Sequence, residues 1–225
     1  MKRIKLADRV LPRYSRGEEI MNMVTHIVGG GLGVLILINC LFCTTRQNGS
    51  DIAIVGSTIY GISMISVYCI SSIYHGLRVS TAKKVLQIID HCMIYFLIAG
   101  TYTPILLVGF VPHVPIVGWG LLAAEWILGI AAATLTAIDL RRYRVFSMIC
   151  YILMGWGIIF FLPTAISLLT PSGFYLLLSG GIVYTVGAIV YGIGSKIPWM
   201  HSVFHIFVVL GSLLQFLSIY WFILT

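Results

Sequence analysis

Long apolar stretches separated by short polar connections run through most of this chain. A helix needs about 20 predominantly apolar residues to cross a bilayer. We predict seven transmembrane helices at roughly 20–43, 52–75, 86–110, 115–137, 145–168, 174–194 and 201–224. The connections are rich in turn formers, as at residues 47–50 and 170–173. The pattern predicts an all-α membrane protein: a seven-helix transmembrane domain (20–225) that follows a basic cytoplasmic tail (1–19).

The composition agrees with a membrane location. Hydrophobic residues make up 59% of the 225 residues and charged residues only 9%, against roughly 25% in soluble domains. A soluble fold of this size could not bury so much apolar surface, so its solvent is lipid. The net charge is +7. No basic stripe with interleaved aromatic residues accompanies it, so we expect the charges to contact the membrane surface and not nucleic acid.

The basic residues predict the orientation of the helices. With seven spans, all but one of the 14 Lys and Arg residues fall on one side of the membrane, and Arg46 alone falls on the other. Loops rich in Lys and Arg stay in the cytoplasm, so we expect a cytoplasmic N-terminus and an outside C-terminus. The residues on the cytoplasmic side are Lys2, Arg3, Lys5, Arg9, Arg13, Arg16, Arg78, Lys83, Lys84, Arg141, Arg142, Arg144 and Lys196.

Ionisable residues within the predicted spans are candidates for function, because placing them in lipid is costly. His201 and His205 are four residues apart at the start of the seventh span, which puts both on one helix face. His75 ends the second span and Asp90 begins the third. The predicted topology places these groups at one depth on the cytoplasmic side. We interpret the three histidines as zinc ligands; the alternative is interfacial histidines that contact water.

Three neutral histidines and one open position describe a catalytic zinc site, in which the metal lowers the pKa of its bound water to about 7. Asp90 is the candidate that orients this water or accepts its proton. Its alternative role is an ion pair with Lys83 or Lys84. Ser71 lies one helical turn before His75. Its hydroxyl either binds the water or a developing oxyanion, or bonds to its own helix backbone.

Three other polar residues of the spans have less specific interpretations. His26, near the start of the first span, is either a fourth ligand or, as we favour, a partner in a helix-packing hydrogen bond. His91 points about 100° away from Asp90 on the same helix, so we do not expect it in the same site. Glu125 lies in the middle of the fourth span, where it lines a polar cavity or pairs within the bundle.

Four motifs of this chain resemble the bacterial hemolysin III proteins. They are Glu19-x-x-Asn22-x-x-Thr25-His26, Ser71-x-x-Tyr74-His75, Asp90-His91-x-x-Ile94-Tyr95-x-x-Ile98-Ala99-Gly100-x-Tyr102-Thr103-Pro104 and His201-x-x-x-His205. That group belongs to the progestin and adiponectin receptor family and is more distantly similar to the alkaline ceramidases. The resemblance extends from about residue 19 to the C-terminus, and the four motifs together are highly specific.

The resemblance implies a seven-helix bundle with a cytoplasmic N-terminus and with zinc on His75, His201 and His205. It also implies that an aspartate and a serine, here Asp90 and Ser71, lie beside the zinc-bound water. In the receptor and ceramidase branches the associated activity is hydrolysis of a ceramide amide. For a bacterial member we expect the inner, or plasma, membrane as the location.

The leading hypothesis is a zinc-dependent membrane hydrolase that acts on a lipid amide or ester. Membrane lipids would be its partners and would enter between helices; Asp90 would act as base and Ser71 as hydrogen-bond donor. One alternative is a non-enzymatic sensor or regulator of membrane lipid state, in which zinc ties the second and seventh helices together. Another is a pore-forming cytolytic protein. Against a pore, the spans show no row of charges across the bilayer.

Overall fold

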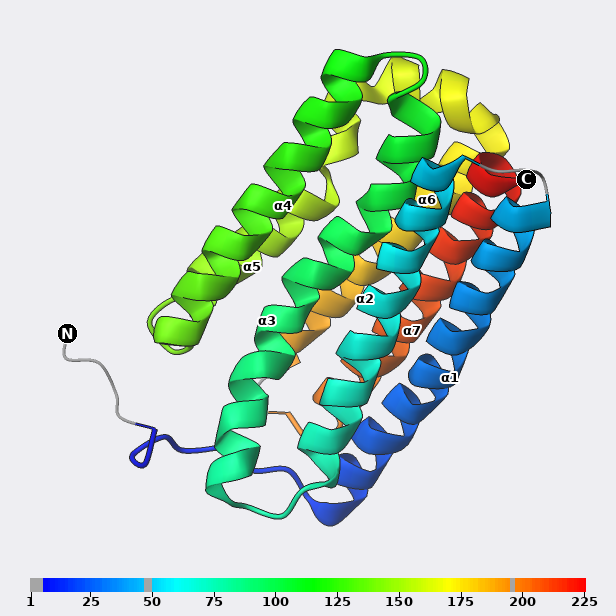
Figure 1. The fold of residues 1–225 in the computed structure, drawn as a ribbon. Helices are drawn as coiled ribbons and strands as arrows, with labels where there is room; N and C mark the ends of the chain where they lie inside the picture. The colour runs from blue at the N-terminus through cyan, green and yellow to red at the C-terminus, as the bar shows by residue number, and fades with distance from the viewer. Residues whose placement is uncertain (1–5, 47–49, 195–196) are drawn as a thin grey trace.

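Helices form nearly all of the described structure, a computed structural model that describes residues 6–46, 50–194 and 197–225. The long helices run side by side as a bundle (Figure 1). In chain order the elements are α1 (Arg16–Arg46), α2 (Asp51–Gly76), α3 (Thr81–Pro104), the π-helix η1 (Ile105–Phe110), α4 (Pro115–Ile138), α5 (Arg144–Gly155), the 3₁₀-helix η2 (Gly157–Phe161), α6 (Leu162–Ile193), α7 (Met200–Ile219) and the π-helix η4 (Tyr220–Leu224).

The outside of the bundle is apolar, and several polar side chains lie inside it. Large apolar side chains such as Ile38, Ile127 and Phe160 are exposed. Among the buried side chains are histidines, serines, threonines and Glu125. This distribution fits a protein whose helices are surrounded by lipid, because lipid solvates apolar surface and offers polar groups no partner. The prediction of an all-helical membrane bundle is confirmed at this level.

The predicted number of seven separate spanning helices is not confirmed. In the described part of the chain, six helical segments are long and apolar enough to cross a membrane. The predicted fifth and sixth spans, 145–168 and 174–194, fall together in one of them, Arg144–Ile193, of 50 residues. Within it, α5 has only 12 residues, about 18 Å of helix, which is too short to cross about 30 Å of hydrocarbon by itself.

The 50-residue segment is nevertheless bent back on itself. The helical conformation is interrupted at Thr170 (φ 59°, ψ 162°), directly before Pro171, because proline disfavours helical dihedrals in the residue that precedes it. The indole nitrogen of Trp156 donates to the hydroxyl of Thr185 at 3.0 Å; a straight helix would put these residues about 43 Å apart. In Figure 1, α5 runs alongside α4, the chain turns beyond the end of α5, and α6 runs back in the opposite direction.

The starts of α1, α3 and α7 and the end of α2 meet at one end of the bundle (Figure 1). Serine side chains cap the starts of α2 and α3, and the second of these is at this end of the bundle. Ser50 caps the start of α2 by accepting from the backbone N–H of Ala53, and Ser80 caps α3 by accepting from that of Lys83. N-caps of this kind satisfy donors that a helix start leaves free. The Ser80 cap places Lys83 in the first turn of α3, near the end of α2.

Close packing between α1 and α2 depends on glycines of α1. A Cβ atom on Gly29 would lie 2.5 Å from the ring of Tyr68, a side chain of α2 that is completely buried. A Cβ atom on Gly31 of the same helix would meet nothing within 4 Å. Small residues of this kind let membrane helices approach closely, so Gly29 helps to set the position of α1 against α2.

We predict that Gly29→Ala lowers the stability of the protein by about 1–3 kcal/mol, the usual range for an overpacked core. Gly31→Ala is the matched control, because both changes gain the same helix propensity and only the first creates a clash. Thermal unfolding of both variants in the same detergent tests this. Equal melting temperatures for the two variants would contradict the packing argument.

Candidate metal centre

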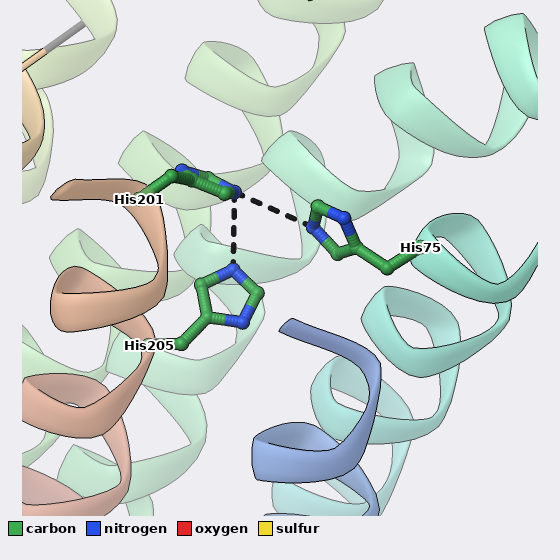
Figure 2. Close-up of side chains that lie close together, drawn as sticks. All are labelled: His75, His201 and His205. Carbon is green, nitrogen blue, oxygen red and sulfur yellow. Dashed lines mark hydrogen bonds between the residues drawn. The ribbon is translucent and has the colours of Figure 1, made fainter. Parts of the chain in front are cut away.

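Three histidines converge where the end of α2 meets the start of α7. The Nε2 atom of His201 lies 3.3 Å from Nε2 of His75 and 3.1 Å from Nε2 of His205. One nitrogen of each ring lies within 4.8 Å of the others. Figure 2 shows the three rings pointing toward a common centre from their two helices. His75 and His205 are buried, and His201 is partly buried.

In His75 and His205, the hydrogen bond at Nδ1 determines whether Nε2 has a lone pair available for a metal ion. Nδ1 of His75 lies 2.7 Å from Oε2 of Glu19, and Nδ1 of His205 lies 3.2 Å from the backbone carbonyl of Asn22. Both oxygens accept hydrogen bonds, so each Nδ1 carries the proton and each Nε2 presents a lone pair to the centre. One N–H at Nε2 of His201 could be donated to only one of them. A cation satisfies all three lone pairs together.

The spacing of the nitrogens also fits a metal ion. Zinc binds imidazole nitrogen at about 2.0–2.1 Å in tetrahedral geometry, which places neighbouring ligand nitrogens about 3.3–3.4 Å apart. The two Nε2 distances from His201, 3.1 and 3.3 Å, are close to this value. Imidazole ligands suit zinc, copper, iron and nickel. The residues present therefore could hold a transition-metal ion.

Glu19 links the metal centre to α3. Its Oε1 atom accepts a hydrogen bond from Nζ of Lys83 at 2.6 Å, while Oε2 accepts from His75. Lys83 is buried and also donates to the carbonyl of Leu77 at 2.9 Å. A carboxylate that fixes the tautomer of a ligating histidine is typical of metal sites and raises the basicity of the ligand. Lys83 in turn places a positive charge beside this carboxylate.

Asn22 of α1 contacts both helices that carry the candidate ligands, α2 and α7. Its side-chain oxygen accepts from the hydroxyl of Ser202 at 2.6 Å, and its amide nitrogen lies 3.4 Å from Nδ1 of His75. Glu19 and Asn22 stand three residues apart and so share a helix face. No role was predicted for Glu19 or Asn22 from the sequence, although both are in the first motif. Their spacing was the available signal, but it does not indicate which histidines they contact.

Residues before α1 cover His201. The ring of Tyr14 stacks on that of His201, with centroids 4.9 Å apart and planes 14° apart. Burial raises the pKa of the Tyr14 phenol, so this side chain is neutral.

Glu18 accepts a hydrogen bond from the backbone N–H of Trp199 at 2.7 Å. Trp199 has a left-handed backbone (φ 68°) directly before α7, a costly conformation for a bulky residue, and the Glu18 contact helps to hold it there.

Asp90 and Ser71 line the same cavity as His201 and His205, and its volume is about 630 Å³. The Ser71 hydroxyl is buried and has no hydrogen-bond partner among the described residues, so its alternative bond to its own helix is not observed. Asp90 does not pair with either lysine. Lys83 is bound to Glu19, and Lys84 donates to the carbonyl of Ala7.

His26 and His91 lie outside the cluster of three ligands but line the same cavity. The ring of His26 stacks on that of His205, with centroids 3.7 Å apart. Neither nitrogen of His26 has a hydrogen-bond partner in the described structure, so the predicted helix-packing hydrogen bond is wrong. Nδ1 of His91 lies 3.8 Å from Oδ2 of Asp90 and 2.8 Å from the carbonyl of Gln87.

An apolar helical bundle with three convergent histidines at one end defines an integral membrane protein with a candidate metal centre. The chain belongs to the haemolysin-III related family, whose model matches residues 14–216. This confirms the resemblance to the hemolysin III proteins.

Two Bacillus proteins are similar to this chain over nearly its whole length. Hemolysin-3 of Bacillus cereus is 40% identical over 207 residues, which are 92% of each chain. The Hemolysin-3 homolog of Bacillus subtilis (strain 168) is 38% identical over 205 residues, 90% of this chain and 92% of that protein. The human monocyte to macrophage differentiation factor is a more distant relative, 25% identical over 172 residues, 72% of this chain and 68% of that protein.

We predict that the purified protein binds one divalent transition-metal ion per chain and that His201→Ala with His205→Ala abolishes the binding. Glu19→Gln should lower the metal affinity about 10–100-fold, because the amide fixes the His75 tautomer less strongly. Asp51→Asn, at the start of α2, is the control and should bind as the wild type does. Elemental analysis and metal titration measure both quantities. Full metal content in the double histidine variant would refute the site.

Proposed function

We propose that this protein is a zinc-dependent hydrolase that cleaves an amide or ester bond of a membrane lipid. The main support is the position of the three histidines, whose Nε2 atoms converge while two of the rings line a cavity inside the bundle. Zinc bound there would polarise a substrate carbonyl and supply a nucleophile from water at neutral pH. The bacterial inner membrane is the proposed location.

Asp90 and Ser71 are the proposed catalytic residues, on α3 and α2. The carboxylate of Asp90 has no lysine or arginine partner in the described structure, so it is free to accept a proton from an attacking water. The Ser71 hydroxyl has no acceptor of its own and faces the cavity. It can therefore donate to the negative charge that develops on a carbonyl oxygen.

The walls of the cavity suit the acyl chain of a lipid. Apolar side chains of several helices line it, among them Leu97 of α3, Leu177 of α6 and Val208 of α7. Tyr14, Asp90 and His201 line its polar end. An amphiphile would place its chain against the apolar walls and its carbonyl beside the histidines.

The alternative function is a membrane sensor in which zinc has a structural role. The observation that favours it is the number of segments that meet at the histidines. Glu19 and Asn22 of α1, His75 of α2, Lys83 of α3 and His205 of α7 form one connected network. A metal in this network would hold four helices together without any chemical step.

We also propose that the chain crosses the membrane seven times with a cytoplasmic N-terminus. The reversal at Thr170 gives the 50-residue segment two antiparallel arms, which supports two crossings. The basic residues at the end of the bundle that holds the histidines include Arg9, Arg13, Lys83, Lys84, Arg141 and Arg144. Arg46 lies at the opposite end, where α1 ends. Lys2, Arg3, Lys5 and Lys196, which the orientation prediction also used, lie outside the described residues.

Reporter fusions at the two ends test this topology. We expect a cytoplasmic reporter to be active only at the N-terminus and an extracytoplasmic reporter only at the C-terminus, because an odd number of crossings separates the ends. A C-terminus that reports from the cytoplasm would mean that Arg144–Ile193 does not cross twice.

Asp90→Asn separates the two functions. The amide has nearly the same size but accepts no proton, so we expect zinc to be retained and hydrolysis to fall about 10²–10⁴-fold. Purified wild type and variant are compared on ceramide and phospholipid substrates, with zinc measured in both and Asp51→Asn as the control. Equal product release from wild type and Asp90→Asn would remove Asp90 from the mechanism. Zinc without hydrolysis in either protein would favour the sensor.

A further inference from the structure

Glu125 is a carboxylic acid buried near the middle of α4, and the proposed hydrolysis makes no use of it. It lies about 15 Å of helix from the start of Pro115–Ile138 and about 20 Å from its end, and only 5% of its surface is exposed. Its Oε2 atom has no hydrogen-bond partner among the described residues, and no basic side chain there forms an ion pair with it. An ionisable residue at this depth of a membrane protein is a candidate for function.

The carboxyl group lies against the break between α5 and η2. A Cβ atom on Gly157, the first residue of η2, would be 3.0 Å from Oε1 of Glu125 and 3.8 Å from the hydroxyl of Tyr102. Glycine at this position leaves room for both oxygens. The carboxyl group and the Tyr102 hydroxyl therefore flank one point of the backbone, where the α-helical hydrogen-bonding pattern is interrupted.

Tyr102 satisfies backbone groups at this break. Its hydroxyl donates to the carbonyl of Gly155 at 3.1 Å and accepts from the N–H of Ile158 at 3.1 Å. Irregular backbone within a membrane needs such partners, because lipid supplies none. The single proton of the Tyr102 hydroxyl is thus already donated to Gly155, so Tyr102 cannot also stabilise a negative charge on Glu125.

These contacts determine the charge state of Glu125. A buried carboxylate without a cation or a hydrogen-bond donor is strongly unfavourable, and such a group becomes neutral by taking up a proton. The protonated acid leaves no charge to compensate. None of the ion pairs among the described residues includes Glu125.

A route for the proton lies beside this group. Tyr102, Gly155 and Ile158 line the 630 Å³ cavity, which extends to polar residues including Asp90 and Asp139 at the end of the bundle that holds the histidines. Water that enters the cavity from that end can reach the Tyr102 hydroxyl. We propose that Glu125 is a proton-binding site within the membrane, protonated at neutral pH and in exchange with solvent protons through this cavity.

Ionisation of Glu125 would change the wall of the cavity. The Tyr102 hydroxyl is the nearby donor, and donating to the carboxylate would break its bond to the Gly155 carbonyl. The junction of α5 and η2 would then lose a backbone partner in the middle of the bundle. Proton binding at Glu125 thus preserves the Tyr102 contacts that hold this junction.

Infrared difference spectroscopy tests the proposal without requiring bound metal or activity. The spectrum of the wild type minus that of Glu125→Gln, in lipid nanodiscs at pH 7, should contain the carbonyl stretch of a protonated carboxylic acid. This band should shift in D₂O and vanish as the pH is raised. Asp51→Asn is the matched control: Asp51 is exposed, so its difference spectrum should contain carboxylate bands only.

Carboxylate bands from Glu125 at pH 7, or an acid band that does not shift in D₂O, would overturn the proposal. Circular dichroism shows whether Glu125→Gln folds. A second measurement needs only the wild type, because the apolar reagent dicyclohexylcarbodiimide modifies protonated carboxyl groups in membranes. Mass spectrometry should find the adduct on Glu125. An unmodified Glu125 would overturn the proposal.

Discussion

Lipid supplies no hydrogen bonds, so every polar group that this chain places inside the bundle must find a partner within the protein. Most of the organisation of the structure follows from this constraint. Serine and threonine hydroxyls bond to the backbone of their own helices, as Thr101 does to Leu97 and Thr136 to Ala132. Longer polar side chains reach other helices instead, as Tyr68 of α2 reaches Ser212 of α7. The polar groups that remain without a partner are therefore candidates for function.

At the candidate metal centre, polar side chains from several helices meet. Glu19, Lys83 and His75 come from three helices and satisfy one another. Each Nδ1–H that is bonded on the outside leaves a lone pair on the inside, so the outer contacts create the electron-rich centre between the rings. Helix packing and metal binding thus depend on the same hydrogen bonds. A change in the position of α1 would alter the ligands, although α1 carries none of them.

Interruptions of regular helix are the second consequence of the constraint. Thr170 and Pro171 turn the chain where a straight helix of 50 residues would extend far beyond the bilayer. The break after Gly155 is different, because it lies inside the bundle and is held by Tyr102. Tyr102 belongs to the motif that begins at Asp90, and this backbone role accounts for a tyrosine there. The unpartnered acid Glu125 lies beside this second break.

The amino-acid sequence by itself determined the membrane location, the helical class, the family and the three candidate ligands. These features depend on apolar length and on spacing within a helix, as with His201 and His205, which are local properties. Only the tertiary structure decided which groups meet. His75 lies 126 residues from His201 along the chain, and no spacing rule brings Glu19 to its Nδ1. The fold-back within Arg144–Ile193 was decided in the same way, by contacts such as Trp156 with Thr185. The facing surfaces of helices are set by close approaches such as Gly29 against Tyr68, and these depend on the shapes of two distant segments at once.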